Sequence, residues 1–514
     1  MAYMKYVNPV IPGYNPDPSI CRVGDDFYLV NSTFEFFPGV PIYHSKNLVN
    51  WELIGHCLTS EEQLYLRGCR NSGGIYAPTI RYHEGTFFMI TTNVTHKGNF
   101  VVHTKDIRGR WSKPNWIDQG GIDPSLFWDD DGTCYYCSTG TIDGVRGTVT
   151  FVIDPFTGEI LSEKKIISSG CGGQCPEGPH IYKKDGYYYH LLAEGGTEYG
   201  HRVTIQRSRN IWGPYEDCPH NPIFTHKEYK ASEIHATGHA DIIQDQHGKW
   251  WMVFLGIRRF SHALLHNLGR ETFLAPVKWE EGGWPVCGNG GTIEYVTDAP
   301  LPAPVKPVCH DLRFDFSSPM PKRVFYTRNP DYGNYALDNA GKKLTLIGTD
   351  VKITEAGASP TILNMRQQGF FTTATAKMSL AETCAERAGI AAYYNNDYHY
   401  AIYLGNDGGG RYIGFTKQVH DINFQAYKEY LTEQTDVELK IESDRHQYTF
   451  SYRQGECEWT IAGSGLNAGL STEGTYTMTF TGTLYSMFAE NGNGVFLDAF
   501  DINVREDPVV AAQI

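Results

Sequence analysis

Hydrophobic and polar positions repeat along the first half of the chain. Each unit has a short apolar run, a polar turn with Gly or Asp, and then an aromatic run; five units begin at Asp17, Ala77, Asp123, Glu177 and His239. Two apolar or alternating runs on either side of a short polar turn are typical of a β-hairpin. The pattern therefore predicts five hairpins of one design.

The spacing of the units extends this prediction from hairpins to whole blades. Successive units begin 60, 46, 54 and 62 positions apart, which is enough for the four strands of one propeller blade with its loops. The later part of the unit also recurs, because residues 44–51, 103–111 and 206–214 each run from a predicted strand into a turn that carries Trp. We predict a five-bladed β-propeller over residues 1–298.

The second half of the chain has a different pattern. Residues 298–307 contain four prolines, and such a segment is stiff and extended. Beyond it, alternating stretches at 370–378, 398–403 and 496–504 lie between Gly- and Asn-rich turns and predict antiparallel strands. We expect an all-β protein with a Pro-rich linker at 299–308 and a β-sandwich of jelly-roll or concanavalin-like type at 309–514.

Composition and charge limit the classes of molecule that the protein can bind. The 514 residues include 58 acidic and 44 basic side chains, and a net charge of -14 would repel nucleic acid and anionic membranes. The N-terminal residues lack a signal-peptide pattern, and the 12 cysteines lack the spacing of a zinc site. These features predict a cytoplasmic protein with reduced thiols and leave a homo-oligomer open.

The repeat also predicts where the chemistry lies. Equivalent positions of successive blades converge on the central channel, so Asp17, Asp123 and Glu177 should face one another. One Asp before Pro is usually a turn residue. Three carboxyl groups gathered in one partly buried place are costly, because like charges disfavour ionisation, and such clusters are typical of catalytic sites.

Several motifs carry a close resemblance to glycoside hydrolase family 43, the β-xylosidases and α-L-arabinofuranosidases, over nearly the whole chain. They are Asn15-Pro-Asp-Pro-Ser19, Ser32-Thr-Phe-Glu-Phe-Phe-Pro-Gly39, Ser72-Gly-Gly-Ile-Tyr-Ala-Pro78, Gly121-Ile-Asp-Pro-Ser125, Pro176-Glu-Gly-Pro-His180, Gly238-His-Ala-Asp241 and Leu268-Gly-Arg-Glu-Thr-Phe273. The resemblance implies that Asp17 is the general base, that Glu177 is the general acid, and that Asp123 orients Glu177 and raises its pKa. An inverting glycosidase needs its base and acid about 6.5–9.5 Å apart, a gap that different blades can supply.

The same resemblance implies a small sugar pocket. Arg270 would hydrogen-bond sugar hydroxyl groups and Phe34 would form an apolar wall. Tyr76 stands where many relatives have Trp, which leaves the preferred sugar open. A loop of the second domain would close the pocket with an aromatic residue, for which Phe488 is the candidate.

His239 occupies the fifth equivalent position. The resemblance implies a structural calcium ion near it in the propeller channel, held mostly through water, and no cofactor for the chemistry. An isolated His is more often a hydrogen-bonded core residue, and imidazole suits calcium poorly. Both interpretations remain open from the sequence.

The expected activity is removal of terminal α-L-arabinofuranosyl residues from arabinoxylan or arabinan oligosaccharides, with some β-D-xylosidase activity. A predominantly β-D-xylosidase activity, on 1,4-linked xylan chains, is the first alternative. The others are a non-catalytic propeller that binds carbohydrate and a retaining hydrolase that acts on fructosides, whose nucleophile and acid would lie about 5–5.5 Å apart.

Overall fold

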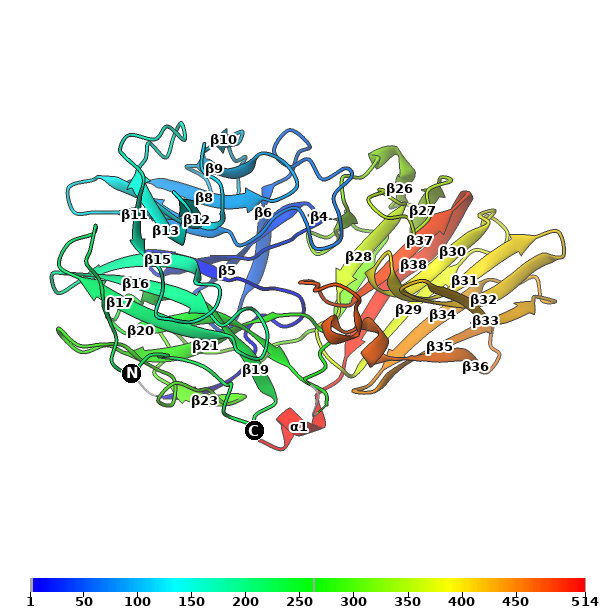
Figure 1. The fold of residues 1–514 in the computed structure, drawn as a ribbon. Coiled ribbons are helices and arrows are strands. Elements are labelled where there is room, and N and C mark those ends of the chain that lie inside the picture. The colour runs from blue at the N-terminus through cyan, green and yellow to red at the C-terminus, as the bar shows by residue number, and fades with distance from the viewer. Residues whose placement is uncertain (1–2, 262–263, 514) are drawn as a thin grey trace.

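The computed structural model describes residues 3–261 and 264–513. Strands form almost all of its regular structure, and they divide into two bodies that lie side by side (Figure 1). Radially arranged small sheets form one body and two long sheets form the other. The all-β prediction of a propeller followed by a sandwich is confirmed.

Within the described residues the first body contains five four-stranded antiparallel sheets. Four are built from consecutive strands, and the first omits only the short strand at residues 36–37. Their strands are β2 (Ser19–Val23), β3 (Asp26–Val30), β5 (Gly39–Ser45) and β6 (Glu52–Leu58); β7 (Thr79–His83), β8 (Thr86–Asn93), β9 (Gly98–Thr104) and β10 (Asn115–Trp116); β11 (Ile122–Trp128), β12 (Cys134–Ile142), β13 (Val145–Val152) and β14 (Lys165–Ser168); β15 (Glu177–Lys184), β16 (Tyr187–Glu194), β17 (Arg202–Ser208) and β18 (Glu216–Asp217); and β19 (Ile234–Gln244), β20 (Trp250–Arg258), β21 (Glu271–Lys278) and β22 (Val286–Cys287). Each of the five sequence repeats begins at, just before or within the first strand of one sheet.

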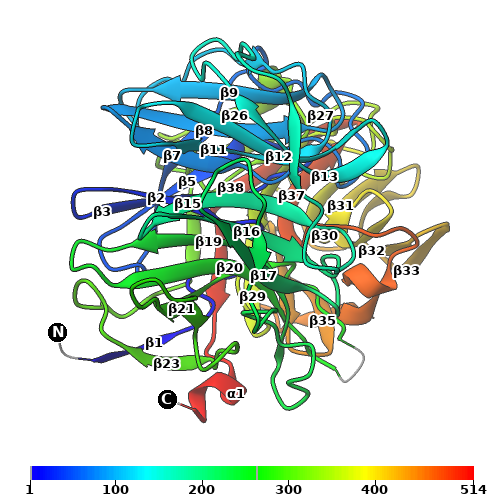
Figure 2. The same cartoon turned by 60° about the vertical axis from the view of Figure 1, so that its left-hand side comes forward.

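These first strands form a closed ring. β2 contacts β7, β7 contacts β11, β11 contacts β15, β15 contacts β19, and β19 returns to β2. The ring is also fastened on its outer side, where β1 (Met4–Val7) pairs with β23 (Val296–Ala299). Figure 2 shows β1 and β23 together near the N-terminus. The first and last parts of the propeller are therefore held together by backbone pairing.

A buried polar network ties the ring together at its centre. Asp241 accepts hydrogen bonds from Ser19 Oγ at 2.7 Å, from Arg81 Nη1 at 2.7 Å and from the Tyr182 hydroxyl at 2.6 Å. Arg81 also contacts His180 Nδ1 at 2.9 Å. These residues come from four different first strands, so the network fixes their relative positions beneath the pocket described below.

The second body is a two-sheet sandwich. One sheet has β24 (Leu312–Asp315), β26 (Tyr335–Asp338), β27 (Lys343–Gly348), β29 (Thr372–Met378), β34 (Val437–Ser443), β35 (Gln447–Gln454), β36 (Thr460–Leu466) and β38 (Gly492–Val504). The other has β28 (Ile362–Arg366), β30 (Arg387–Asn395), β31 (Tyr398–Asp407), β32 (Gly410–Val419), β33 (Ile422–Tyr430) and β37 (Leu484–Glu490). Residues 300–311, which contain most of the Pro-rich segment, have no regular structure between β23 and β24.

Short elements complete the described chain. They are β4 (Phe36–Phe37), β25 (Tyr326–Thr327), the 3-10 turns η1 (Tyr332–Asn334), η2 (Asn467–Leu470) and η3 (Thr472–Gly474), and α1 (Pro508–Ala511). β4 belongs to the propeller and pairs with β25, so a small sheet bridges the two bodies. None of the helices in the described ranges is both long enough and apolar enough for a membrane crossing.

Candidate active site

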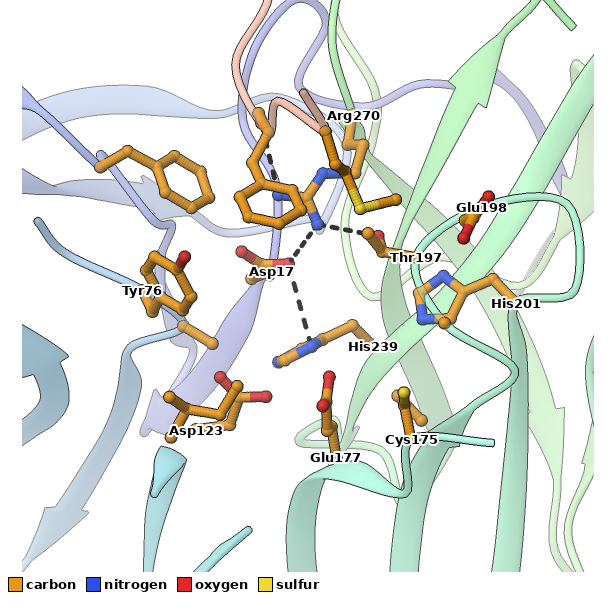
Figure 3. Close-up of a pocket in the computed structure, with 17 residues that line it drawn as sticks. Asp17, Tyr76, Asp123, Cys175, Glu177, Thr197, Glu198, His201, His239 and Arg270 are labelled. Carbon is orange, nitrogen blue, oxygen red and sulfur yellow. Dashed lines mark hydrogen bonds and ion pairs between the residues drawn. The ribbon is translucent and has the colours of Figure 1, made fainter. Parts of the chain in front are cut away.

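A pocket of about 290 Å³ opens where the propeller meets the sandwich. This volume lies at the lower limit of the usual range for small-molecule sites, about 300–1,000 Å³, and suits a ligand of one or two rings. Figure 3 shows carboxylates, aromatic rings and histidines that converge on it. The predicted residues that line it are Asp17, Phe34, Tyr76, Asp123, Glu177, His239 and Arg270.

The repeat brings these side chains together through unusual backbone at the start of the inner strands. Asp17, Asp123 and His239 have φ angles of 51°, 57° and 45°, in the left-handed region that few non-glycine residues adopt. The registers of β11, β15 and β19 shift at or next to Asp123, Glu177 and His239. Such bulges turn side chains away from the regular strand direction and are frequent beside active sites.

Asp17 is held as a carboxylate. It is 5% exposed, accepts a hydrogen bond from Ser32 Oγ at 2.5 Å, and lies 3.2 Å from Arg270 Nη1 and 3.8 Å from His239 Nδ1. Burial alone would raise its pKa, but the Arg270 and His239 charges and the Ser32 hydrogen bond outweigh burial and hold the pKa below its usual value. Asp17 therefore stays ionised at neutral pH.

Asp123 and Glu177 have the opposite tendency. Burial raises the pKa of Asp123 well above its usual value, and the charges of Glu177 and Asp17 add to this effect. Burial also raises the pKa of Glu177, although Arg146 Nη2, which donates to Glu177 Oε1 at 2.8 Å, opposes the rise. Because these two pKa values are raised and that of Asp17 is lowered, the pair keeps a proton at a pH at which Asp17 has already lost its own.

Arg270 connects the carboxylate to the walls of the pocket. Besides Asp17, its guanidinium donates to Thr197 Oγ1 at 2.9 Å and to the Phe480 carbonyl at 3.3 Å (Figure 3). It lies over the rings of Phe34 and Phe480, at 5.7 Å and 5.2 Å from their centroids. Its Nε, which is buried, has no hydrogen-bond partner among the described residues. The hydrogen bonds to Asp17, Thr197 and Phe480 hold the guanidinium in place at the pocket wall.

The aromatic wall combines residues of both bodies. Phe34 packs against Tyr76 with ring centroids 5.4 Å apart, and Phe480 lies 5.6 Å from Phe34 and 5.9 Å from Tyr76. The Phe480 backbone N–H donates to Ser72 Oγ at 2.9 Å, which fixes the sandwich loop on the propeller. One end of the pocket is therefore closed by aromatic rings.

The prediction for Phe488 is wrong. Phe488 lies within β37, is fully buried, and belongs to a hydrophobic cluster shared by the sandwich and the propeller, but it does not line the pocket. Phe480, eight positions earlier in the loop before β37, lines the pocket instead, together with Met478.

Comparison with known proteins identifies this assembly. Residues 6–285 match the model of glycosyl hydrolases family 43, and residues 313–499 match the beta xylosidase C-terminal concanavalin A-like domain. The chain belongs to glycosyl hydrolase family 43. The family has an inverting mechanism, so this glycoside hydrolase is an inverting enzyme.

The relatives of this family 43 chain include enzymes with two activities. It is 41% identical to a non-reducing end alpha-L-arabinofuranosidase of Bacteroides ovatus, over 96% of this chain and 93% of that protein. It is 35% identical to a beta-xylosidase of Bacillus subtilis, over 79% of this chain and 80% of the relative. A solved xylan beta-1,4-xylosidase of Bacillus halodurans superposes with a TM-score of 0.90 at 32% identity, over 97% of this chain and 100% of the other.

The surroundings of His239 do not fit directly bound calcium. Asp17, its nearest carboxylate, already accepts from Ser32 and Arg270, and Asp241 below it is paired with Arg81. The described residues contain no group of three or more His, Cys, Asp or Glu side chains arranged to hold a metal. Instead, the ring of His239 packs against Gly178, where an added Cβ would lie 3.0 Å from it. In this family 43 site the His239 ring therefore lies between Asp17 and β15, the strand that carries Glu177.

Sequence reasoning missed several residues in and beside the pocket. Cys175, Glu198 and His201 line it, and Arg146 contacts Glu177. Glu198 and His201 belong to the loop between β16 and β17, in the segment Thr197-Glu-Tyr-Gly-His201. The sequence around Arg146 indicates only a turn, at Asp143-Gly144 just before it, and nothing there points to the pocket.

We expect Phe480→Ala to raise KM for an aryl glycoside about tenfold. Loss of one ring face, about 1.5 kcal/mol of apolar contact, corresponds to that factor. Steady-state kinetics would measure it, with Phe424→Ala as the control, because Phe424 is an exposed ring on β33. An unchanged KM in the Phe480 variant would contradict the closed wall.

Proposed function

We propose that the protein releases terminal α-L-arabinofuranosyl residues from arabinoxylan or arabinan oligosaccharides, with β-D-xylosidase activity in the same pocket. The mechanism rests on the opposite environments of its carboxyl groups, which lower the pKa of Asp17 and raise those of Asp123 and Glu177. At a pH between these pKa values Asp17 is ionised, whereas the Asp123–Glu177 pair retains a proton. An inverting hydrolase needs one carboxylate and one carboxylic acid at the same pH.

In this proposal Asp17 accepts a proton from a water molecule, and the oxygen of that water forms a bond to the anomeric carbon. The bond from that carbon to the glycosidic oxygen breaks, and Glu177 gives its proton to the leaving oxygen. Asp123 holds and orients Glu177 and keeps the proton within the pair. Arg270 and the rings of Phe34, Tyr76 and Phe480 hold the sugar that is released.

The closed aromatic end supports an exo action. A sugar chain cannot pass through Phe34, Tyr76 and Phe480, which pack on one another, so a terminal residue fits and an internal one does not. The arabinofuranosidase of Bacteroides ovatus, which matches at 41% identity over most of both chains, supports arabinofuranose as the first sugar. The matching beta-xylosidases support xylose as the second.

Assays with the 4-nitrophenyl derivatives of α-L-arabinofuranose and β-D-xylopyranose test the sugar preference. We expect a higher kcat/KM for the arabinofuranoside. A higher value for the xyloside would make the protein chiefly a β-D-xylosidase. Proton NMR of the first anomer released from the preferred substrate would accompany the assay, since inversion is expected.

The pH dependence follows from the same carboxyl groups. Activity should fall as pH drops through the lowered pKa of Asp17, which must be ionised, and as pH rises through the raised pKa of Glu177, which must be protonated. We expect a bell-shaped plot of kcat/KM against pH. In Asp123→Asn the basic limb should move to lower pH, because Glu177 loses its like-charged neighbour. An unmoved limb would remove Asp123 from this role.

We also propose a cytoplasmic location. All 12 cysteines are free, and seven of them are buried. Free thiols in this number suit a reducing compartment. Imported oligosaccharides would then be the substrates, and cell fractionation would test the location.

A further inference from the structure

Arg146 is a cation placed beside the proposed acid by a short hairpin. It lies on β13, where it pairs in register with Thr141 of β12. The two-residue turn between these strands is Asp143-Gly144, with φ angles of 49° and 79°, as tight hairpin turns require. Such a turn fixes the direction of the first residues of β13.

The contact lies on the solvent side of the acid. Arg146 Nη2 donates to Glu177 Oε1 at 2.8 Å, and the two side chains are 53% and 29% exposed. By contrast, the side chains of Arg270 and Asp17 are only 9% and 7% exposed. The pocket thus has a buried arginine on the base and an exposed arginine on the acid.

The position of the general acid in a glycosidase indicates where the leaving group binds. The acid donates to the oxygen between the terminal sugar and the leaving group, so its outer side borders the leaving group. In the proposed function the terminal sugar lies against Phe34, Tyr76 and Phe480, which line the pocket, whereas Arg146 is not among the lining residues. Arg146 therefore stands where the leaving sugar would pass.

We propose that Arg146 forms the leaving-group subsite and acts as a positioning residue for Glu177. It holds the carboxyl group at the outer side of the pocket, and when substrate is bound it donates to hydroxyl groups of the leaving sugar instead. This inference rests on the proposed hydrolase function. An exposed ion pair is weak, so exchanging one acceptor for another costs little.

This exchange also affects the proton. While Arg146 contacts Glu177, it lowers the pKa of that carboxyl group and so favours the proton on Asp123. A leaving sugar that draws the guanidinium away removes this effect and favours the proton on Glu177, where catalysis uses it. Binding of a substrate with a sugar leaving group would then favour the protonated form of Glu177 that catalysis requires.

Kinetics with two leaving groups test the proposal. Arg146→Met should lower kcat/KM for a disaccharide about 10- to 100-fold, the factor expected for a lost charge-assisted hydrogen bond. An aryl glycoside with the same terminal sugar should lose less than about threefold, since it lacks those hydroxyl groups. Arg146→Lys should recover part of the loss. Arg313→Met, which removes an exposed arginine paired with Asp501 on the sandwich, is the matched control.

The pH profile separates positioning from a merely structural role. In Arg146→Met the basic limb of kcat/KM for the disaccharide should move to higher pH, opposite to the shift expected for Asp123→Asn. Equal losses on both substrates with an unmoved limb would overturn the proposal. So would unchanged kinetics on the disaccharide.

A binding measurement keeps this test independent of hydrolysis. In the Asp17→Asn background, calorimetry with xylobiose and xylose, or with the arabinose equivalents, compares two rings with one. Adding Arg146→Met should weaken disaccharide binding about tenfold and leave monosaccharide binding unchanged. Equal disaccharide affinity with and without Arg146 would refute the subsite. If the wild-type protein cleaves neither substrate while the two variants differ in disaccharide binding as expected, only the hydrolase function is refuted.

Discussion

Asp17→Asn is expected to lower kcat about 10²- to 10⁴-fold on every substrate, whatever the leaving group. The amide keeps the size of the side chain but cannot accept the proton of the attacking water. The amide oxygen can accept from Arg270 as Asp17 Oδ1 does, and the amide NH2 group can donate to the Ser32 hydroxyl in place of Asp17 Oδ2, so the pocket should keep its shape. Single-turnover and steady-state kinetics on an aryl glycoside and on a disaccharide would measure the loss.

Asp25→Asn is the matched control for this substitution. Asp25 is an exposed carboxylate in the turn between β2 and β3, only eight residues from Asp17. Its replacement should leave kcat unchanged. Circular dichroism would show that both variants are folded. A folded Asp17→Asn enzyme with more than about a tenth of the wild-type kcat would exclude Asp17 as the base.

Glu177→Gln should give a loss that depends on the leaving group. For a sugar leaving group, which needs protonation, kcat should fall about 10²- to 10⁴-fold. For 4-nitrophenolate, a stable anion, the loss should be much smaller. The basic limb of the pH profile should disappear, because no carboxylic acid is left to ionise at the leaving oxygen.

The control for the acid is Glu216→Gln. Glu216 lies on β18 of the same sheet, is exposed, and pairs with Arg207 outside the pocket. It should retain full activity on both substrates. Equal losses on the aryl glycoside and the disaccharide in Glu177→Gln would mean that Glu177 does not protonate the leaving group.

The sequence predicted the propeller residues of the site because the repeat is local. Each unit carries its own turn and its own aromatic strand, so Asp17, Asp123 and Glu177 could be placed at one equivalent position without any long-range information. The structure adds the reason that these positions point inward, which is the left-handed backbone and the shifted registers. Neither feature is visible in a hydrophobic pattern.

The contribution of the sandwich could not be predicted in the same way. Residues 476–490 form one run rich in Thr and aromatic residues, and nothing in it marks where the loop ends and β37 begins. Phe488 lies on the strand side of that limit and Phe480 on the loop side. Which of the two rings reaches the pocket depends on how the loop docks on Ser72, some 400 residues away in sequence. Arg146 was missed for a similar reason, since only the ring of blades brings it to Glu177.

The contact between the Phe480 backbone and Ser72 has a thermodynamic consequence. A sugar that packs on Phe34 and Phe480 touches both bodies at once, so its binding energy also holds the two bodies together. Ligand binding and interdomain docking are then reciprocally linked. Sugar should make the propeller and the sandwich unfold more nearly as one cooperative unit, and any substitution that loosens their interface should weaken the affinity for sugar by the same coupling energy.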